Sequence, residues 1–117
     1  AEKITQDAVA SVLDFEAPIC GYEIHVGRTD AGSGAQSWLN CGGRVIGHRD
    51  AHGQVEGGYL HGLFGNDDFR RHYLRKLGLN VATDLNFNAA VESALDDLAA
   101  AMERHLDIDG LLKTAGL

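Results

Sequence analysis

The stretch of sequence that decides the fold is Glu56-Gly57-Gly58-Tyr59-Leu60-His61-Gly62-Leu63-Phe64-Gly65. It is short, apolar and bracketed by glycine, which is typical of a buried strand that ends at a functional loop. Before it, β-like runs alternate with glycine-rich turns, and after it the periodicity becomes helical. The sequence therefore predicts an α/β protein with a sheet portion over about residues 1–65 and a helical portion over about 66–117.

Upstream of this stretch, the sequence predicts a strand and a hairpin. The strand covers Cys20–Arg28, just after Pro18, and alternates apolar Tyr22, Ile24 and Val26 with Glu23, His25 and Gly27. The hairpin joins Gln36–Asn40 to Arg44–Gly47 through a turn at Asn40–Gly43, and a polar loop follows at His48–Val55. The segment Val9–Leu13 fits either a strand or a short helix.

Three helices are expected downstream. The first begins at Asn66 as N-cap and stops at Gly78, with acidic residues in its first turn and basic residues in its last. The second covers about Asn88–Leu106, where one apolar stripe contains Val91, Leu95, Leu98 and Met102. A short third helix covers Ile108–Ala115.

Composition limits the function classes. A chain of 117 residues with 44% hydrophobic residues suffices for one domain with its own core. The net charge of −7 argues against nucleic acid and anionic membrane partners. No apolar run approaches the roughly 20 residues of a membrane span, and the N-terminus lacks the apolar centre of a signal peptide. The only two cysteines, Cys20 and Cys41, are expected to be free thiols in a reducing cytoplasm.

Among six histidines, His61 is the candidate catalytic residue. It lies in an apolar, glycine-rich strand end, where a parallel sheet would deliver it to the carboxyl edge that carries sites in α/β proteins. A histidine there can act as a general base near neutral pH, although a core histidine bonded to the backbone fits the local pattern equally well. His72 and His105 are expected on solvated helix faces.

Other polar residues offer weaker candidates. Glu23 and His25 share one strand face, so they either orient His61 or contact substrate, or form the solvent side of an edge strand. His48 and His52 fall in a turn-like loop rather than a helix, which argues against a metal site. Neither cysteine begins a helix after a tight turn, so neither fits a nucleophile.

Three blocks in the same order resemble the cobyric acid synthase family of cobalamin biosynthesis. The blocks are Gly21–Thr29 (GYEIHVGRT), Gly58–Phe64 (GYLHGLF) and Asn66–Arg71 (NDDFRR). The resemblance covers most of the chain and is strongest over residues 18–77. It implies the C-terminal part of a class I glutamine amidotransferase domain with a flavodoxin-like α/β fold.

The resemblance also implies a function. Glutamine would be hydrolysed and its ammonia passed to a synthetase domain, which uses ATP and Mg²⁺ to amidate carboxylates of a corrinoid, adenosylcobyrinic acid a,c-diamide. His61 would be the glutaminase histidine, activating a cysteine and protonating ammonia. Many class I amidotransferases carry a glutamate two residues beyond this histidine; that position is Leu63 here, so Glu23 becomes a conceivable orienting residue.

The nucleophilic cysteine of the family lies upstream of these blocks, and no such segment is present here. The chain is therefore expected to be a fragment without ATP site, cofactor or metal, inactive alone and prone to self-association through exposed apolar surface. Two alternatives stay open. One is a non-catalytic binding or interaction domain on the same scaffold; the other is a metal-binding module that uses His25, His48, His52 and His61.

Overall fold

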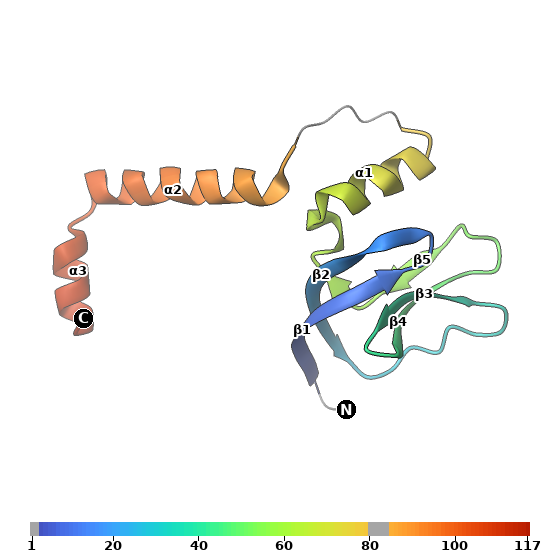
Figure 1. The fold of residues 1–117 in the computed structure, drawn as a ribbon. Helices are drawn as coiled ribbons and strands as arrows, with labels where there is room; N and C mark the ends of the chain where they lie inside the picture. Colours follow the sequence, from blue (N-terminus) through green and yellow to red (C-terminus); the bar gives the residue numbers. More distant parts are fainter. Residues whose placement is uncertain (1–2, 80–84) are drawn as a thin grey trace. The chain divides into compact units, whose positions relative to one another are not determined.

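The computed structural model describes residues 3–79 and 85–117 (Figure 1). The chain divides into two compact units, Ala1–Ala82 and Thr83–Leu117, which are described separately. Within the described ranges, no helix combines the length and the apolarity that a bilayer span requires.

The first unit is built on six strands that form one curled sheet. These are β1 (Lys3–Val12), β2 (Phe15–Val26), β3 (Gln36–Cys41), β4 (Arg44–Arg49), β5 (Glu56–Gly58) and β6 (Leu60–His61). Their order in the sheet is β5-β4-β3-β1-β2-β6. Only Tyr59 separates β5 from β6 in the chain, and its backbone bonds to both β4 and β2. The two ends of the sheet therefore meet, and the strands form a nearly closed barrel.

Every strand pair in the described part is antiparallel, so the prediction of a parallel sheet that delivers His61 to its carboxyl edge is wrong. The physical reason is the length of the connections, because a parallel pair needs a crossover of a dozen or more residues. β1 and β2 are joined by Leu13 and Asp14 alone, and β3 and β4 by Gly42 and Gly43. The predicted hairpin at residues 36–47 is confirmed, and Val9–Val12 belong to a strand rather than a helix.

Pro18 lies inside β2 and not before it. The ladder between β1 and β2 shifts register between Ala10, which pairs with Ile19, and Val12, which pairs with Phe15. Pro18 falls in this irregular stretch, where its missing N–H costs no regular ladder bond. The strand predicted over Cys20–Arg28 is confirmed at residues 20–26; the observed strand begins earlier, at Phe15, and ends two residues sooner, at Val26.

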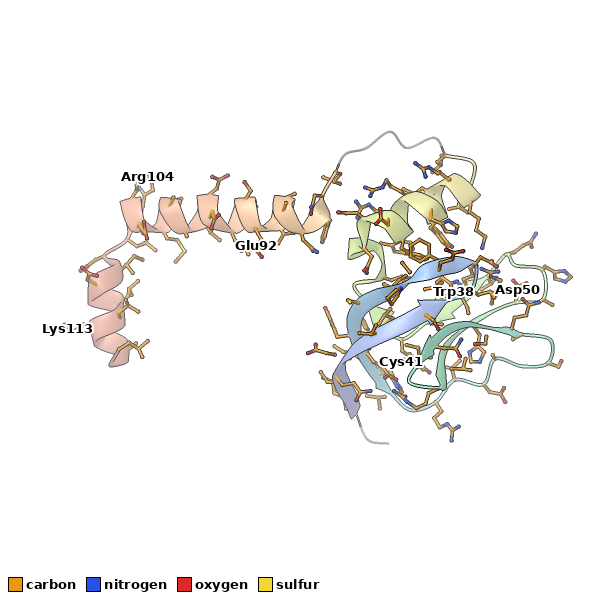
Figure 2. All side chains as sticks on the ribbon, viewed as in Figure 1. Trp38, Cys41, Asp50, Glu92, Arg104 and Lys113 are labelled. Carbon is orange, nitrogen blue, oxygen red and sulfur yellow. The ribbon has the colours of Figure 1, made fainter. Side chains whose placement is uncertain are left out.

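The barrel interior is filled by alternate side chains of the long strands. After β6, the 3₁₀ turn η1 (Leu63–Gly65) leads into α1 (Asp67–Lys76), whose Phe69 is 2% exposed. Phe69 meets the ring of Phe15 edge-on, with ring centroids 5.3 Å apart, so α1 packs on the barrel. The core consists of Ala8, Ala10, Val12, Ile19, Trp38, Leu39, Ile46, Leu60, Leu63 and Phe69 (Figure 2 labels Trp38).

A partly buried ion network fastens α1 to the strands. Arg49 at the end of β4 donates to Asp14 in the β1–β2 turn (2.6 Å) and to Glu56 in β5 (2.5 Å). Lys76 in the last turn of α1 also donates to Glu56, at 3.0 Å. The Glu56 carboxylate raises the pKa of the Tyr73 hydroxyl on the same helix. The β1–β2 turn, β4, β5 and α1 are thus tied by charge as well as by apolar packing.

The second unit contains α2 (Phe87–His105) and α3 (Ile108–Ala115), which confirms the two predicted helices to within one residue. Asn86 and Asp107 cap them by accepting the amides of Ala89 and Gly110, and Gly116 ends α3 in a left-handed conformation. Neither helix has a buried residue. The predicted apolar stripe of α2 is 40–55% exposed at Val91, Leu95, Leu98 and Met102; Figure 2 labels Glu92 and Arg104 on the same helix.

Candidate functional site

The most buried charged side chain is Glu23 of β2, which is 0% exposed. Its carboxylate accepts two bonds from the Arg44 guanidinium, at 2.8 and 3.2 Å, and one from the Gln6 amide at 2.9 Å. The His25 ring lies 2.9 Å away through Nε2. The interpretation of Glu23 and His25 as the solvent side of an edge strand is therefore wrong, because β2 lies between β1 and β6 with this face inward.

The period-two alternation of β2 is present, but its apolar face is the outward one. Tyr22 and Val26, on the apolar face of the predicted strand, are 47% and 65% exposed. Sequence alternation gives the period but not the side, and here the buried residue is Glu23, whose carboxylate is bound by the half-exposed Arg44 side chain. Sequence reasoning missed Arg44. A glutamate that is buried needs a cationic partner, so the burial of Glu23 is the signal that would have pointed to one.

Hydrogen bonds to Glu23 fix its protonation. Hydrogen bonds from Arg44 lower the pKa of Glu23 to about 2, so its carboxylate is ionised at neutral pH. His25 faces an acceptor on each ring nitrogen, the Glu23 carboxylate at Nε2 and the Gly27 carbonyl at Nδ1, 2.9 Å away. These two contacts fix the orientation of the His25 ring, which stacks on Tyr59 with ring centroids 3.9 Å apart.

An open pocket of about 1330 Å³ lies beside this cluster. His25, Arg44 and Tyr59 line it on the barrel side, and residues 27–32 line it on the loop side. Thr29 reaches back to hydrogen bond through its hydroxyl with that of Tyr59. His61 does not line this pocket. The sequence-predicted histidines are therefore divided between two places rather than gathered in one.

His61 ends β6 on the opposite side of β2 from the buried cluster. It pairs with Tyr22, and the two rings stack at 5.5 Å between centroids with 9° between their planes. Its Nε2 donates to the main-chain carbonyl of Ile24 at 3.3 Å. The side chain is exposed, which excludes the core-histidine interpretation. Glu23 does not reach His61; its oxygens bind Gln6, His25 and Arg44.

Close approach of β6 to β2 requires glycine at position 21. A Cβ built on Gly21 would lie 2.2 Å from the carbonyl oxygen of His61, well inside van der Waals contact. Because that oxygen belongs to the backbone, it can move away from a Cβ only if β6 and β2 separate. The glycine in this first block therefore sets the position of His61.

Gly21→Ala is expected to lower the free energy of unfolding by about 1–3 kcal/mol, the usual cost of overpacking. Urea unfolding followed by circular dichroism measures it. Gly57→Ala is the matched control, since a Cβ on that strand glycine meets nothing within 4 Å. Equal stability of the two variants would contradict the proposed contact.

Asn66 joins the segment after His61 to β2. It occupies the N-cap position of α1, as predicted, yet its side chain makes no cap bond to the helix. Instead its amide nitrogen donates to the Cys20 carbonyl at 2.9 Å, and its oxygen accepts the Cys20 N–H at 3.4 Å. The side chain thus imitates a strand residue and extends the ladder beyond β6.

Asn66→Ala is expected to cost about 1–3 kcal/mol of unfolding free energy and to speed hydrogen exchange at the Cys20 amide. Asn66→Asp keeps an acceptor for that amide and loses the donor to the carbonyl, so its Cys20 amide should stay closer to wild-type protection. Exchange is followed by NMR. If Asn66→Ala left the Cys20 amide as protected as before, the bridging role would be wrong.

The remaining candidates lie apart. Cys20 and Cys41 are free thiols; Cys41 ends β3 and is followed by β4 rather than a helix, as expected. His48 is in β4, not in the predicted loop, whereas His52 is in the loop and exposed. His72, expected on a solvated face, is half-buried with its ring 5.3 Å from that of Phe15. Within residues 3–79 and 85–117, no three His, Cys, Asp or Glu side chains are grouped as metal ligands.

Comparison with known proteins agrees with the three sequence blocks. Residues 1–69 match the CobB/CobQ-like glutamine amidotransferase domain. The chain is 45% identical over 114 residues to the cobyric acid synthase of Ruegeria sp. (strain TM1040), covering 97% of this chain and 23% of that protein. It is 48% identical over 98 residues to that of Bradyrhizobium diazoefficiens, covering 84% and 20%. No solved structure matches the chain.

The chain spans about a fifth to a quarter of the length of the curated relatives that it matches. The family match covers the whole barrel and the start of α1, and therefore includes Glu23, His25 and His61. The resemblance to cobyric acid synthases is confirmed. This chain belongs to the CobB/CobQ-like glutamine amidotransferase family.

Proposed function

We propose that this chain supplies the histidine side of the glutaminase site of a cobyric acid synthase. The observation that carries the proposal is His61, an exposed imidazole held on a fixed strand end within a family-matched segment. In the parent protein, glutamine would be hydrolysed and its ammonia used to amidate a corrinoid, with ATP and Mg²⁺ acting in the synthetase part. The parallel strands of a flavodoxin-like sheet would also lie outside this chain.

His61 has the chemistry that such a site needs. A neutral imidazole takes the proton of a cysteine thiol, and the sulfur attacks the amide carbon of glutamine. The protonated ring then gives that proton to the departing nitrogen, so ammonia leaves and a thioester remains. Water hydrolyses the thioester to glutamate. The cysteine must come from outside this chain, because Cys41 is in the β3–β4 hairpin and Cys20 lacks the helix that an activating turn requires.

The exposed apolar side chains on β1 and β2 support incorporation in a larger protein. Val9, Tyr22 and Val26 are 58%, 47% and 65% exposed on strands that are otherwise well paired. Outward apolar residues on a strand of this kind usually meet another layer. The remainder of the same polypeptide is the expected cover; without it, the chain is expected to self-associate.

Glutamate release from glutamine tests the proposal. The 117-residue chain alone is expected to release none, whereas a protein of the relatives' length that contains this sequence is expected to turn over. Mixing the chain with the missing upstream part should restore activity. A parent-length protein that binds glutamine but never hydrolyses it would instead favour the non-catalytic binding domain. Elemental analysis of the purified chain tests the third alternative, a metal-binding module, which would contain stoichiometric metal.

A further inference from the structure

His61 needs a group that fixes its ring, and among residues 3–79 and 85–117 no carboxylate bonds to it. Leu63, two residues further on, is a buried apolar residue of η1. Glu23, the nearest acid in the same strand pair, is bonded to Gln6, His25 and Arg44. A different group must therefore select the tautomer of the His61 ring.

The main-chain carbonyl of Ile24 on β2 is such a group, because the backbone at Tyr59, between β5 and β6, does not donate to it. In a hydrogen-bonded pair of an antiparallel ladder, the two opposing residues exchange both N–H···O bonds. Ile24 and Tyr59 exchange one, from the Ile24 N–H to the Tyr59 carbonyl at 3.3 Å. The Tyr59 N–H turns to the other side and donates to the Ile46 carbonyl of β4 at 2.9 Å. The turn that closes the barrel thus diverts the usual donor from the Ile24 carbonyl.

The His61 ring takes that place, with Nε2 3.3 Å from the Ile24 oxygen. A carbonyl oxygen only accepts, so Nε2 must carry the proton. Tyr22 lies flat against one face of the ring, 5.5 Å between centroids and 9° between planes, which limits its rotation. The geometry points to the Ile24 main-chain carbonyl as the group that orients His61, with Tyr22 as a positioning residue and Nδ1 as the proton-accepting atom.

This inference rests on the proposed function and specifies which ring nitrogen of His61 accepts the thiol proton and which keeps its own. The thiol proton moves to Nδ1 as the Sγ electron pair forms the bond to the amide carbon, and the Nε2–H stays on the Ile24 carbonyl throughout. When the carbon–nitrogen bond breaks, the Nδ1 proton goes to the leaving ammonia. The carbonyl dipole stabilises the imidazolium between these steps, as a carboxylate does in triads, without a charge.

The first test is made on the 117-residue chain and needs no activity. In ¹⁵N-histidine-labelled protein above the histidine titration, long-range proton–nitrogen spectra report the tautomer of each ring. His61 is expected as the Nε2–H form, with an Nε2 proton that exchanges several-fold more slowly than that of exposed His105. A Nδ1–H form, or exchange as fast as at His105, would overturn the assignment.

The second test is made on the parent-length protein. Tyr22→Leu is expected to lower kcat for glutamate release about tenfold or more with little change in KM. A misplaced His61 ring stabilises the transition state less well but does not change how tightly glutamine binds. Tyr22→Phe, which keeps the ring, should restore most of the kcat. A kcat unaffected by Tyr22→Leu would refute the positioning role. If His61 proves not to be the Nε2–H tautomer while His61→Ala is inactive, the orientation by Ile24 is refuted and the proposed function stands. If His61→Ala is fully active, the proposed function itself is refuted.

Discussion

Replacing His61 with alanine in a protein of the parent length is expected to lower kcat/KM for glutamine hydrolysis about 10³-fold, within the range for loss of a general base. The ring is exposed at the end of β6 and supports no core packing, so the fold should survive. Glutamate release is the measurement, and amidation supplied with free ammonia should continue. That contrast separates loss of the glutaminase step from loss of the synthetase.

His105→Ala is the matched control, since that histidine is exposed at the end of α2 in the second unit. Its glutaminase activity should equal that of the unchanged protein. Circular dichroism and urea unfolding of both variants show whether either has lost structure. Glutaminase activity in His61→Ala that stays within about threefold of the unchanged protein would exclude general-base catalysis by this residue.

Arg44→Met is expected to lower the free energy of unfolding of the chain by about 3–5 kcal/mol at pH 7, because it leaves the Glu23 carboxylate fully buried without its cation. Arg44 supplies two of the hydrogen bonds on that carboxylate, at 2.8 and 3.2 Å. The methionine keeps a comparable stem, so lost packing contributes little. Urea unfolding measures the change.

Arg71→Met provides the control for removing a paired arginine. Its partner Asp68 is 84% exposed, and the two are one helical turn apart in α1. Exposed pairs of this kind contribute about 0–1 kcal/mol. If Arg44→Met cost no more than Arg71→Met, the buried cluster would not be held by charge as described.

The same cluster predicts how stability depends on pH. Glu23 has its pKa lowered from 4.5 to about 2 in the folded chain, chiefly by Arg44. A lowered carboxyl pKa contributes stability that is complete above the unfolded value and lost as pH falls through the folded one. Glu23→Gln removes this contribution at every pH. The stability difference between the unchanged chain and Glu23→Gln should therefore shrink between pH 5 and pH 2, and a constant difference would contradict the ionised state.

Much of the local structure could be predicted from the sequence because it depends on neighbours in the chain. The hairpin at residues 36–47 follows from its glycine turn, and both helices of the second unit follow from periodicity and capping residues. The change from strand to helix after the GYLHGLF block is likewise local. His61 became a candidate because of its apolar, glycine-rich strand-end setting, and the three blocks that resemble a family then implied its role.

What failed depended on partners distant in the sequence. Alternation over residues 20–28 could not reveal that Glu23 and His25 face inward, because their burial requires Arg44, 21 residues away from Glu23. The N-cap prediction for Asn66 was correct in position and missed its bonds to Cys20, which lies 46 residues away. The antiparallel pairing of the strands was also missed, since it depends on the length of the connections between strands rather than on strand composition.

The sequence by itself determined the family and the order of strands before helices and singled out His61 as the candidate residue, all from short contiguous patterns. Only the tertiary structure decided which face of β2 is buried, and that the barrel closes through Tyr59. It also decided which atom orients His61: Tyr59 donates its N–H to Ile46, and the carbonyl left on Ile24 receives the histidine ring. Each backbone donor must be satisfied somewhere, and where it is satisfied depends on the whole sheet.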